Sequence, residues 1–385
     1  MGHLFKTAGI AALSLVFLCS CGQDEINIYP TNNQMKKQEL IFACGRDSTG
    51  TLETVLRDFT EQSETTQVKL VELPRNSIDT HRIMKSALTG QETEIDAMLI
   101  EDIWVKEFAK DGYLKDLSGM TKFPAEEYLP GVAELTQNYG SLLWYPMILD
   151  VGVMYYNSEM TAQPLTYDKL VGKGNESYTI QGTDGEEMLC VALELIRAAG
   201  SVQSGLEMYK TAILESGVSG GDDYMSAFKN GKAAYMRGWA SESNDILRGF
   251  SPVRGKVCAA AMETAPGRIC SMARVYGFAV NSAVGKDEAV RELLEYLLRD
   301  EVQKKLVSGI GTLPLHRADY DDPMIMDSAA YYGAYKEQKD ELIYRPQRDD
   351  YTNASREVRS LLTDYIENRA TLEQAETAFV QFIGE

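Results

Sequence analysis

Apolar residues recur along the chain in two patterns, short continuous runs and stripes at helical spacing. Residues 40–44 (LIFAC) form a run that predicts a buried strand, and residues 52–59 carry apolar side chains at intervals of three and four, which predicts a helix. Residues 68–71 return to the strand pattern, and residues 95–100 (IDAMLI) predict another buried strand. This alternation indicates a parallel sheet covered by helices, so we expect an α/β fold.

The second half of the chain continues the mixture of strands and helices. Residues 142–157 (LLWYPMILDVGVMYYN) predict an extended segment, because Pro146 and Gly152 disfavour a helix. Residues 274–281 (RVYGFAVN) are again extended, and the apolar stripe over residues 293–306 predicts a helix. Further helices are expected over residues 186–199, near 204–214, at the start of 222–239 and in two segments that close the chain, the last opening with a capping box at 371–374.

The first twenty residues differ from the rest of the chain. An apolar run of about ten residues is well short of the roughly 20 that a membrane-spanning helix needs. Lys6 precedes the run, which is typical of a secretory signal peptide. The run ends in Leu18-Cys19-Ser20-Cys21, which resembles the bacterial lipoprotein box. We therefore predict a signal peptide over residues 1–20 and a lipid (palmitate) anchor on Cys21; a plain signal peptide cut nearby and a buried helix of an intracellular protein are the alternatives.

Residues 21–38 predict a flexible linker. They are polar, contain Pro30 and show no helical or strand period. Such a segment would join a lipid anchor to a folded region. We expect the protein to lie outside the cytoplasm, tethered to the bacterial cell membrane by lipid alone.

Composition limits the class of protein. The hydrophobic content of 44% and charged content of 25% are typical of a soluble globular protein. The residues that follow the leader and linker are too many for one simple core and suggest two lobes. Because 57 acidic residues outnumber 38 basic ones, the net charge is −19 and no nucleic-acid partner is expected.

Four cysteines follow the leader, at positions 44, 190, 258 and 270. None belongs to a CxxC or Cys/His cluster, so we expect no metal site. Cys44 and Cys190 lie in apolar patterns and predict small core side chains. Cys258 and Cys270 flank a turn with glycine and proline; they either pair in an oxidising compartment or remain free thiols.

The sequence carries no familiar catalytic pattern. His81 and His316 are far apart, and no Gly-x-Ser-x-Gly, P-loop or Gly-x-Gly-x-x-Gly motif occurs. We therefore expect a binding protein without cofactors and without enzymatic activity. A secreted glycoside hydrolase, acting through acidic side chains, is the alternative.

Charged and aromatic side chains follow several predicted strands. In open parallel sheets, ligands lie beyond the carboxyl ends of the strands. Carbohydrates need charged groups for their hydroxyls and a flat aromatic surface for their apolar ring face. The strand ends therefore predict a ligand site that includes Arg46, Asp47, Asp102, Trp104, Asp184 and Glu186, and side chains of these types would suit a carbohydrate.

Five stretches, in the same order, resemble the extracellular solute-binding protein family 1, the maltose/trehalose type that serves ABC importers. They are IDAMLIEDIWVKEFAKDGYLKDLS (95–118), LWYPMILDVGVMYYNSEM (143–160), MSAFKNGKAAYMRGWASES (225–243), VYGFAVN to LPLH (275–316) and YRPQRDDYTNASREVRSLL (344–362). The resemblance covers nearly the whole chain after the linker.

This resemblance implies a two-lobe periplasmic-binding-protein-like fold of type II. Residues 39–147 and 279–340 would form lobe 1, and residues 148–278 and 341–385 would form lobe 2. The lobes would be discontinuous in sequence and joined by crossover strands. The ligand would lie in the cleft between them.

The resemblance also adds candidates to the site. Trp239 matches the ring-stacking position, and Gly238 with the polar residues that follow favours an exposed strand end over a core tryptophan. Asp150 would contact a ligand hydroxyl or make a hinge hydrogen bond. Tyr276 stands where the family often has tryptophan. Arg345 and Tyr351 fall in the third crossover, as site or scaffold.

The function implied is that of a substrate-binding lipoprotein of an ABC importer. It would capture a carbohydrate, a disaccharide or oligosaccharide, by closure of the lobes and deliver it to the permease subunits in the membrane. A monomer is expected. A lipoprotein that senses its ligand and signals to a membrane receptor is the alternative, since the same cleft would serve both.

Overall fold

The computed structural model describes residues 37–384 except 75–76, 91–93, 138, 173–177, 184, 217–222, 248–250, 266 and 330. The predicted signal peptide, the lipidation site Cys21, the linker up to residue 36 and the candidate Asp184 lie outside the described residues. Within the described part, no helix has both the length and the apolar character needed to cross a membrane.

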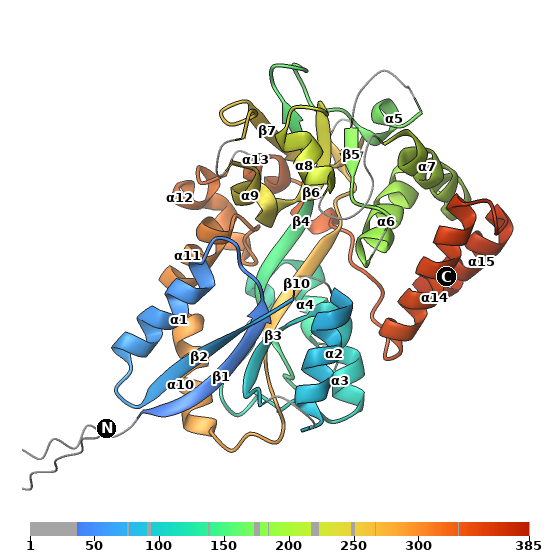
Figure 1. Ribbon diagram of the computed structural model, residues 1–385. Coiled ribbons are helices and arrows are strands. Elements are labelled where there is room, and N and C mark those ends of the chain that lie inside the picture. The colour runs from blue at the N-terminus through green and yellow to red at the C-terminus, as the bar shows by residue number, and fades with distance from the viewer. Residues whose placement is uncertain are drawn as a thin grey trace, which may run out of the picture. The chain divides into compact units, whose positions relative to one another are not determined.

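Eight strands of the described chain form one mixed sheet (Figure 1). Its order is β2-β1-β3-β10-β4-β6-β5, and β7 also pairs with β4. β1 is parallel to β2 and β3, whereas β10 is antiparallel to both β3 and β4. The strands are β1 (Gln38–Gly45), β2 (Thr66–Leu73), β3 (Ala97–Glu101), β4 (Tyr145–Asn157), β5 (Tyr178–Ile180), β6 (Tyr235–Trp239), β7 (Val257–Ala261) and β10 (Ala273–Val280), with a separate hairpin of β8 (Glu263–Ala265) and β9 (Arg268–Ile269).

Helices cover the sheet on both faces, as the alternating sequence pattern predicts. Around β1–β3, α1, α10 and α11 lie on one side and α2 and α3 on the other, while α6, α7, α14 and α15 gather beside the β5 end (Figure 1). The helices are α1 (Thr51–Gln62), α2 (Ser77–Leu88), α3 (Asp102–Lys110), α4 (Pro130–Gln137), α5 (Tyr167–Leu170), α6 (Glu187–Ala199), α7 (Val202–Glu215), α8 (Asp223–Lys229), α9 (Ser243–Leu247), α10 (Asp287–Leu297), α11 (Asp300–Ile310), α12 (Pro323–Met326), α13 (Tyr332–Lys336), α14 (Tyr351–Ile366) and α15 (Leu372–Ile383).

Strand β4 joins the two parts of the sheet. Its residues 145–151 pair with β10, and its residues 152–157 pair with β6 and β7. Gly152 lies at the change of partner, where an added Cβ would approach a Glu194 carboxylate oxygen to 2.3 Å and an Arg237 nitrogen to 2.7 Å. Glycine is therefore required here, because a buried ion pair packs directly against the strand.

The α/β class and most predicted elements are confirmed, with one correction. The apolar stripe over residues 293–306 does not form one helix, because α10 ends at Leu297 and α11 begins at Asp300. Arg299 is extended at the break, and Asp300 and Glu301 place negative charge in the first turn of α11, where the helix dipole favours it. The Gln303 side chain donates to the Leu297 carbonyl at 2.7 Å and so satisfies the end of α10.

The structure confirms the prediction of core positions for two of the cysteines. Cys44 on β1 and Cys190 on α6 are buried in the apolar core. Cys258 and Cys270 are both free thiols, so the possible disulfide between them is not formed in this structure.

Candidate functional site

A cavity of about 520 Å³ opens among segments that are far apart in the sequence. Its wall takes residues from the β1–α1 loop, β3, β4, β6, β10 and the starts of α2 and α6. Seven carboxylates and four cationic side chains line it: Asp47, Glu101, Asp150, Glu186, Glu187, Glu242 and Asp245, with Arg46, Lys229, Arg274 and Arg345. Within the described residues, no group of three or more His, Cys, Asp or Glu side chains is placed to hold a metal ion.

Most of the sequence-predicted residues meet at this cavity. Eight of the eleven candidates line it: Arg46, Asp47, Trp104, Asp150, Glu186, Trp239, Tyr276 and Arg345. Asp102 and Tyr351 do not, because both are buried behind the wall. Asp184 lies outside the described residues.

Arg46 and Asp47, which follow β1, differ in their contacts. Arg46 is exposed at the cavity. Asp47 accepts hydrogen bonds from the backbone nitrogens of Thr49 at 2.8 Å and Leu52 at 2.9 Å. The Asp47 carboxylate therefore holds the start of α1, where unpaired backbone N–H groups favour an acceptor.

Trp239 carries a guanidinium on each face of its indole. The Arg274 guanidinium carbon lies 3.6 Å from the ring centre and the Arg237 carbon lies 4.2 Å from it. The tryptophan is consequently only 1% exposed. The expectation of an exposed indole at a strand end is wrong, because side chains from two other strand positions cover it.

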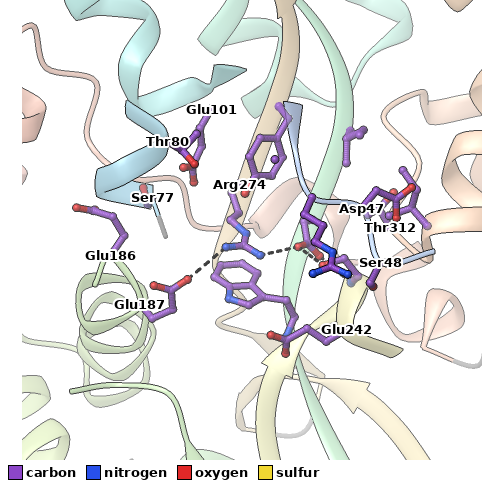
Figure 2. Close-up of a pocket in the computed structure, with 18 of the residues that line it drawn as sticks. Asp47, Ser48, Ser77, Thr80, Glu101, Glu186, Glu187, Glu242, Arg274 and Thr312 are labelled. Atoms are coloured by element: carbon purple, nitrogen blue, oxygen red, sulfur yellow. Dashed lines mark hydrogen bonds and ion pairs between the residues drawn. The ribbon is translucent and has the colours of Figure 1, made fainter. Parts of the chain in front are cut away.

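Arg274 lines the cavity, and Figure 2 shows its guanidinium directed toward Glu187. It lies opposite Asp150 in the β10–β4 ladder, and its Nη2 donates to Asp150 Oδ2 at 2.9 Å. Its Nη1 faces Glu187 Oε1 at the longer distance of 3.5 Å. Burial raises the pKa of Glu187, and the Arg274 charge partly opposes this rise. The guanidinium is thus fixed firmly on one edge and loosely on the other.

Arg237 is held on the opposite, fully buried side. Its Nε and Nη2 donate to the two carboxylate oxygens of Glu194 at 3.0 and 2.8 Å. Glu194 also accepts from the Tyr167 hydroxyl at 2.8 Å and the Met272 backbone nitrogen at 3.0 Å. Burial disfavours the cation, but Glu194 outweighs it and holds the pKa of Arg237 above its usual value.

Asp150 has donors on both carboxylate oxygens. Ser241 donates through its backbone nitrogen at 3.0 Å and its hydroxyl at 2.7 Å, and Val151 donates its backbone nitrogen at 3.0 Å. Together with Arg274, these donors connect β4, β10 and the segment after β6. Asp150 therefore fixes the positions of Arg274 and Ser241 in the cavity wall.

Arg345 lies in the segment before α14 and lines the cavity. It pairs with Glu101 and lies 3.7 Å from Asp102 and 3.9 Å from Glu186. Glu186 in turn accepts from the Tyr351 hydroxyl at 2.8 Å. This buried network supports the wall from behind.

Asp102 is buried at the start of α3 and has a structural role. It accepts from the Val275 backbone nitrogen and from Gln347 Nε2, each at 3.0 Å. Burial raises the pKa of Asp102 to about 6, although the nearby Arg345 charge acts in the other direction. Its carboxylate ties β10 to the segment before α14.

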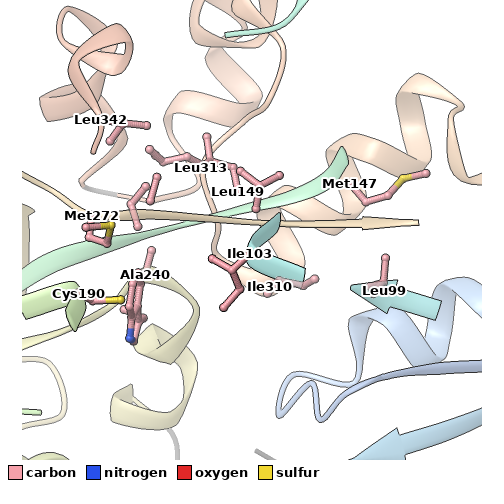
Figure 3. Packing of buried hydrophobic residues seen from close by; sticks show 14 of the residues in the cluster. Leu99, Ile103, Met147, Leu149, Cys190, Ala240, Met272, Ile310, Leu313 and Leu342 are labelled. Carbon is pink, nitrogen blue, oxygen red and sulfur yellow. The ribbon is translucent and has the colours of Figure 1, made fainter. Parts of the chain in front are cut away.

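Apolar side chains complete the cavity wall. Leu99, Cys190 and Ile310 line the cavity and also belong to the buried core. Figure 3 shows them with Ile103 and Ala240, which lie in the same core. The polar residues of the cavity wall are therefore continuous with the packed hydrophobic core.

Sequence reasoning missed several lining residues, among them Arg274, Glu187, Tyr224, Glu242 and Thr312. A signal for Arg274 was present, since positions 274 and 276 share one face of an extended strand. A prediction that placed Tyr276 in the site therefore implied Arg274 as well. The other four gave no comparable local signal.

Comparison with known proteins decides the family. Residues 54–331 match the family described as bacterial extracellular solute-binding protein. The chain belongs to this family. Members bind solutes, and membership implies a location outside the cytoplasm.

Known solute-binding proteins resemble this one over most of its length. A probable ABC transporter-binding protein of Deinococcus radiodurans is 22% identical over 323 residues, which are 72% of this chain and 76% of the relative. Maltose-bound T. maritima MalE3 superposes with a TM-score of 0.80 at 21% identity, covering 90% of this chain and 99% of that one. The GacH receptor of Streptomyces glaucescens gives a TM-score of 0.76 at 18% identity, covering 91% and 99%. These structures show that the solute-binding protein has the two-lobe fold.

Proposed function

We propose that this protein is the substrate-binding lipoprotein of an ABC importer and that its cavity holds a carbohydrate. One observation carries the proposal: hydroxyl, carboxylate, guanidinium and aromatic side chains from both predicted lobes converge on a single cavity of about 520 Å³. That volume lies within the range of about 300–1,000 Å³ typical of small-molecule sites. Charged donors and acceptors suit a ligand that is covered with hydroxyl groups.

The solved relatives support this choice of ligand class. Their structures contain maltose, acarbose, alpha-D-tagatose and D-mannitol, respectively, in four different proteins. These are sugars, a sugar-like inhibitor and a polyol. A disaccharide or smaller polyhydroxylated solute is therefore the first ligand to test here.

The mechanism is capture by closure of two lobes. Lobe 1 comprises residues 39–147 and 279–340, and lobe 2 comprises residues 148–278 and 341–385. A ligand that contacts both lobes only in the closed state shifts the population toward that state. The closed form then docks on the permease subunits and releases the solute.

The anchor is a lipid on Cys21, which follows the signal peptide. Cells grown with radiolabelled palmitate are expected to label the wild type and not Cys21→Ala. Equal labelling of the two proteins would contradict the anchor and leave the binding function untouched.

A thermal-shift screen against sugars and polyols tests the binding function. A ligand that binds the folded state raises the melting temperature by mass action, by an amount that grows with its concentration over Kd. Isothermal titration calorimetry on each positive then gives the affinity. A panel of sugars and polyols that leaves the melting temperature unchanged at millimolar concentration contradicts the carbohydrate proposal.

A further inference from the structure

We propose that Arg274, and not the indole face of Trp239, is the surface that meets the ligand, and that the ligand is a neutral polyol recognised by its hydroxyl edge. This inference rests on the proposed function and narrows it. Its consequence is that open-chain polyols bind about as tightly as the corresponding pyranoses.

The first step is that Trp239 offers no open face. One face lies against Arg237, which is itself 1% exposed and bonded to Glu194 through two nitrogens. The other face lies against Arg274 at 3.6 Å. Trp239 Nε1 is buried and has no hydrogen-bond partner within the described structure. A sugar ring would have to remove an arginine before it could stack here.

The second step is that Arg274 is costly to remove. Its displacement would lose a desolvated cation–π contact with Trp239 and a charge-assisted hydrogen bond to Asp150 at 2.9 Å. The gain would be one stacking contact between the ring and the indole. The exchange would lose two interactions and gain one, so its free energy is unfavourable. Arg274 therefore remains against the indole when ligand is bound.

The third step is that one edge of Arg274 is available. The side chain is 16% exposed and lines the cavity, and its Nη1 lies 3.5 Å from Glu187 Oε1. At that distance the direct hydrogen bond is weak. A ligand hydroxyl can accept from the guanidinium and donate to the carboxylate, because a hydroxyl group does both. The pair therefore suits a hydroxyl group better than either an amine or a carboxylate.

The charge of the wall argues against an acidic ligand. Seven carboxylates against four cations line the cavity, which disfavours an acidic sugar. The wall as a whole attracts cations, but a ligand amine placed at the edge of Arg274 would face the guanidinium at close range. Hydroxyl groups avoid both penalties, and an acyclic polyol presents them without needing an apolar ring face.

Calorimetry on matched pairs tests the inference: D-glucose with D-glucitol, D-mannose with D-mannitol, and maltose with maltitol. For the wild type we expect the Kd values within the best-binding pair to agree within about threefold. Arg274→Met, which keeps an unbranched apolar side chain and removes the charge and the donors, is expected to weaken both members of that pair by about 10- to 30-fold, the loss of one charge-assisted contact.

Arg348→Met is the control, because Arg348 is a surface arginine outside the cavity that pairs with Asp350, and its affinities are expected to match the wild type. If Arg274→Met does not fold, Glu187→Gln provides the same test, with weaker binding expected. A pyranose preferred more than tenfold, or tighter binding by Arg274→Met, overturns the inference while the proposed function stands. Absence of binding to the wild type by every member of the panel contradicts the proposed function itself, and the inference falls with it.

Discussion

Two clusters of charge lie on opposite sides of one indole. Behind Trp239, Arg237 and Glu194 are at most 1% exposed and share two hydrogen bonds. In front, Arg274 is 16% exposed and makes one short contact with Asp150 and one long contact with Glu187. The residue types are the same, but only the front cluster keeps unused hydrogen-bonding capacity at the cavity.

Burial distinguishes a pair that supports the fold from a pair that can bind a ligand. A buried ion pair is costly to break, because removal of one partner leaves an uncompensated charge in the core. A pair at a cavity wall can leave one edge open, since water or ligand completes it. The two clusters should therefore respond differently to the same substitution.

The largest expected effect is on the cluster behind the indole. Glu194→Gln leaves Arg237 buried without its counter-charge, and we expect the free energy of unfolding to fall by about 3–5 kcal/mol. Urea denaturation followed by circular dichroism measures the loss. Glu187→Gln makes the same chemical change in front and is expected to cost less than about 1 kcal/mol. Equal losses would show that the two clusters do not differ in this way.

The next effect concerns Asp102, a buried carboxylate whose oxygen Oδ1 lies 3.7 Å from Arg345 Nη2. The pKa of Asp102 is raised from 3.8 to about 6, so the folded state holds its proton more tightly than the unfolded state. Its contribution to stability is complete below about pH 4 and is lost as the pH rises through 6, by up to about 3 kcal/mol. Unfolding free energies of the wild type and Asp102→Asn at pH 4 and pH 7 measure it. The advantage of the wild type over the variant should be larger at pH 4.

Glu107 provides a control, because its pKa is shifted in the opposite direction from that of Asp102. Burial alone would raise its pKa, but hydrogen bonds from His81 and Lys85 outweigh burial and lower the pKa to about 2. Its contribution is therefore present above about pH 4.5 and is lost as the pH falls toward 2. The advantage of the wild type over Glu107→Gln should be larger at pH 7 than at pH 3. The same direction of change for both variants would rule out this account.

Removing one hydroxyl group should have a smaller effect. Tyr167 donates to Glu194 at 2.8 Å, and a hydrogen bond to a charged group contributes about 2 kcal/mol. We expect Tyr167→Phe to lower the free energy of unfolding by about that amount in urea denaturation. Tyr276→Phe removes a hydroxyl at the cavity and is expected to change stability by less than about 0.5 kcal/mol. A larger loss for Tyr276→Phe would reverse the assignment of scaffold and site.

The smallest effect is expected at Thr312. Its Oγ1 is buried beside the cavity without a hydrogen-bond partner in the described structure. Thr312→Val replaces this hydroxyl by a methyl group, so we expect stability to change by less than about 1 kcal/mol, toward greater stability. Thermal unfolding measures this change. A clear destabilisation would mean that the hydroxyl is satisfied after all.

The sequence was informative where function follows from local pattern. The ends of β1 and β3 were predicted from apolar runs, and the residues after them, Arg46 and Trp104, do line the cavity. This succeeds because the carboxyl ends of neighbouring parallel strands meet at one edge of a sheet. The capping box at Thr371 was also read correctly, because its residues are adjacent in sequence.

The sequence was uninformative where contacts join distant segments. Arg274 and Asp150 are 124 residues apart, and no local pattern shows that they face each other. Trp239 looked exposed because its neighbours in sequence are small and polar, whereas one of the two groups that cover it, Arg274, comes from another strand of the sheet. The break between α10 and α11 was missed because an apolar stripe continues through it. The residue boundaries of the two lobes remain a prediction.

The place of β10 between β3 and β4 determines when the chain can compact during its synthesis. Both neighbours are made early, but they lack their common partner until residues 273–280 have left the ribosome. Contacts of such long sequence separation form slowly. The sheet can therefore be completed only after most of the chain has been made.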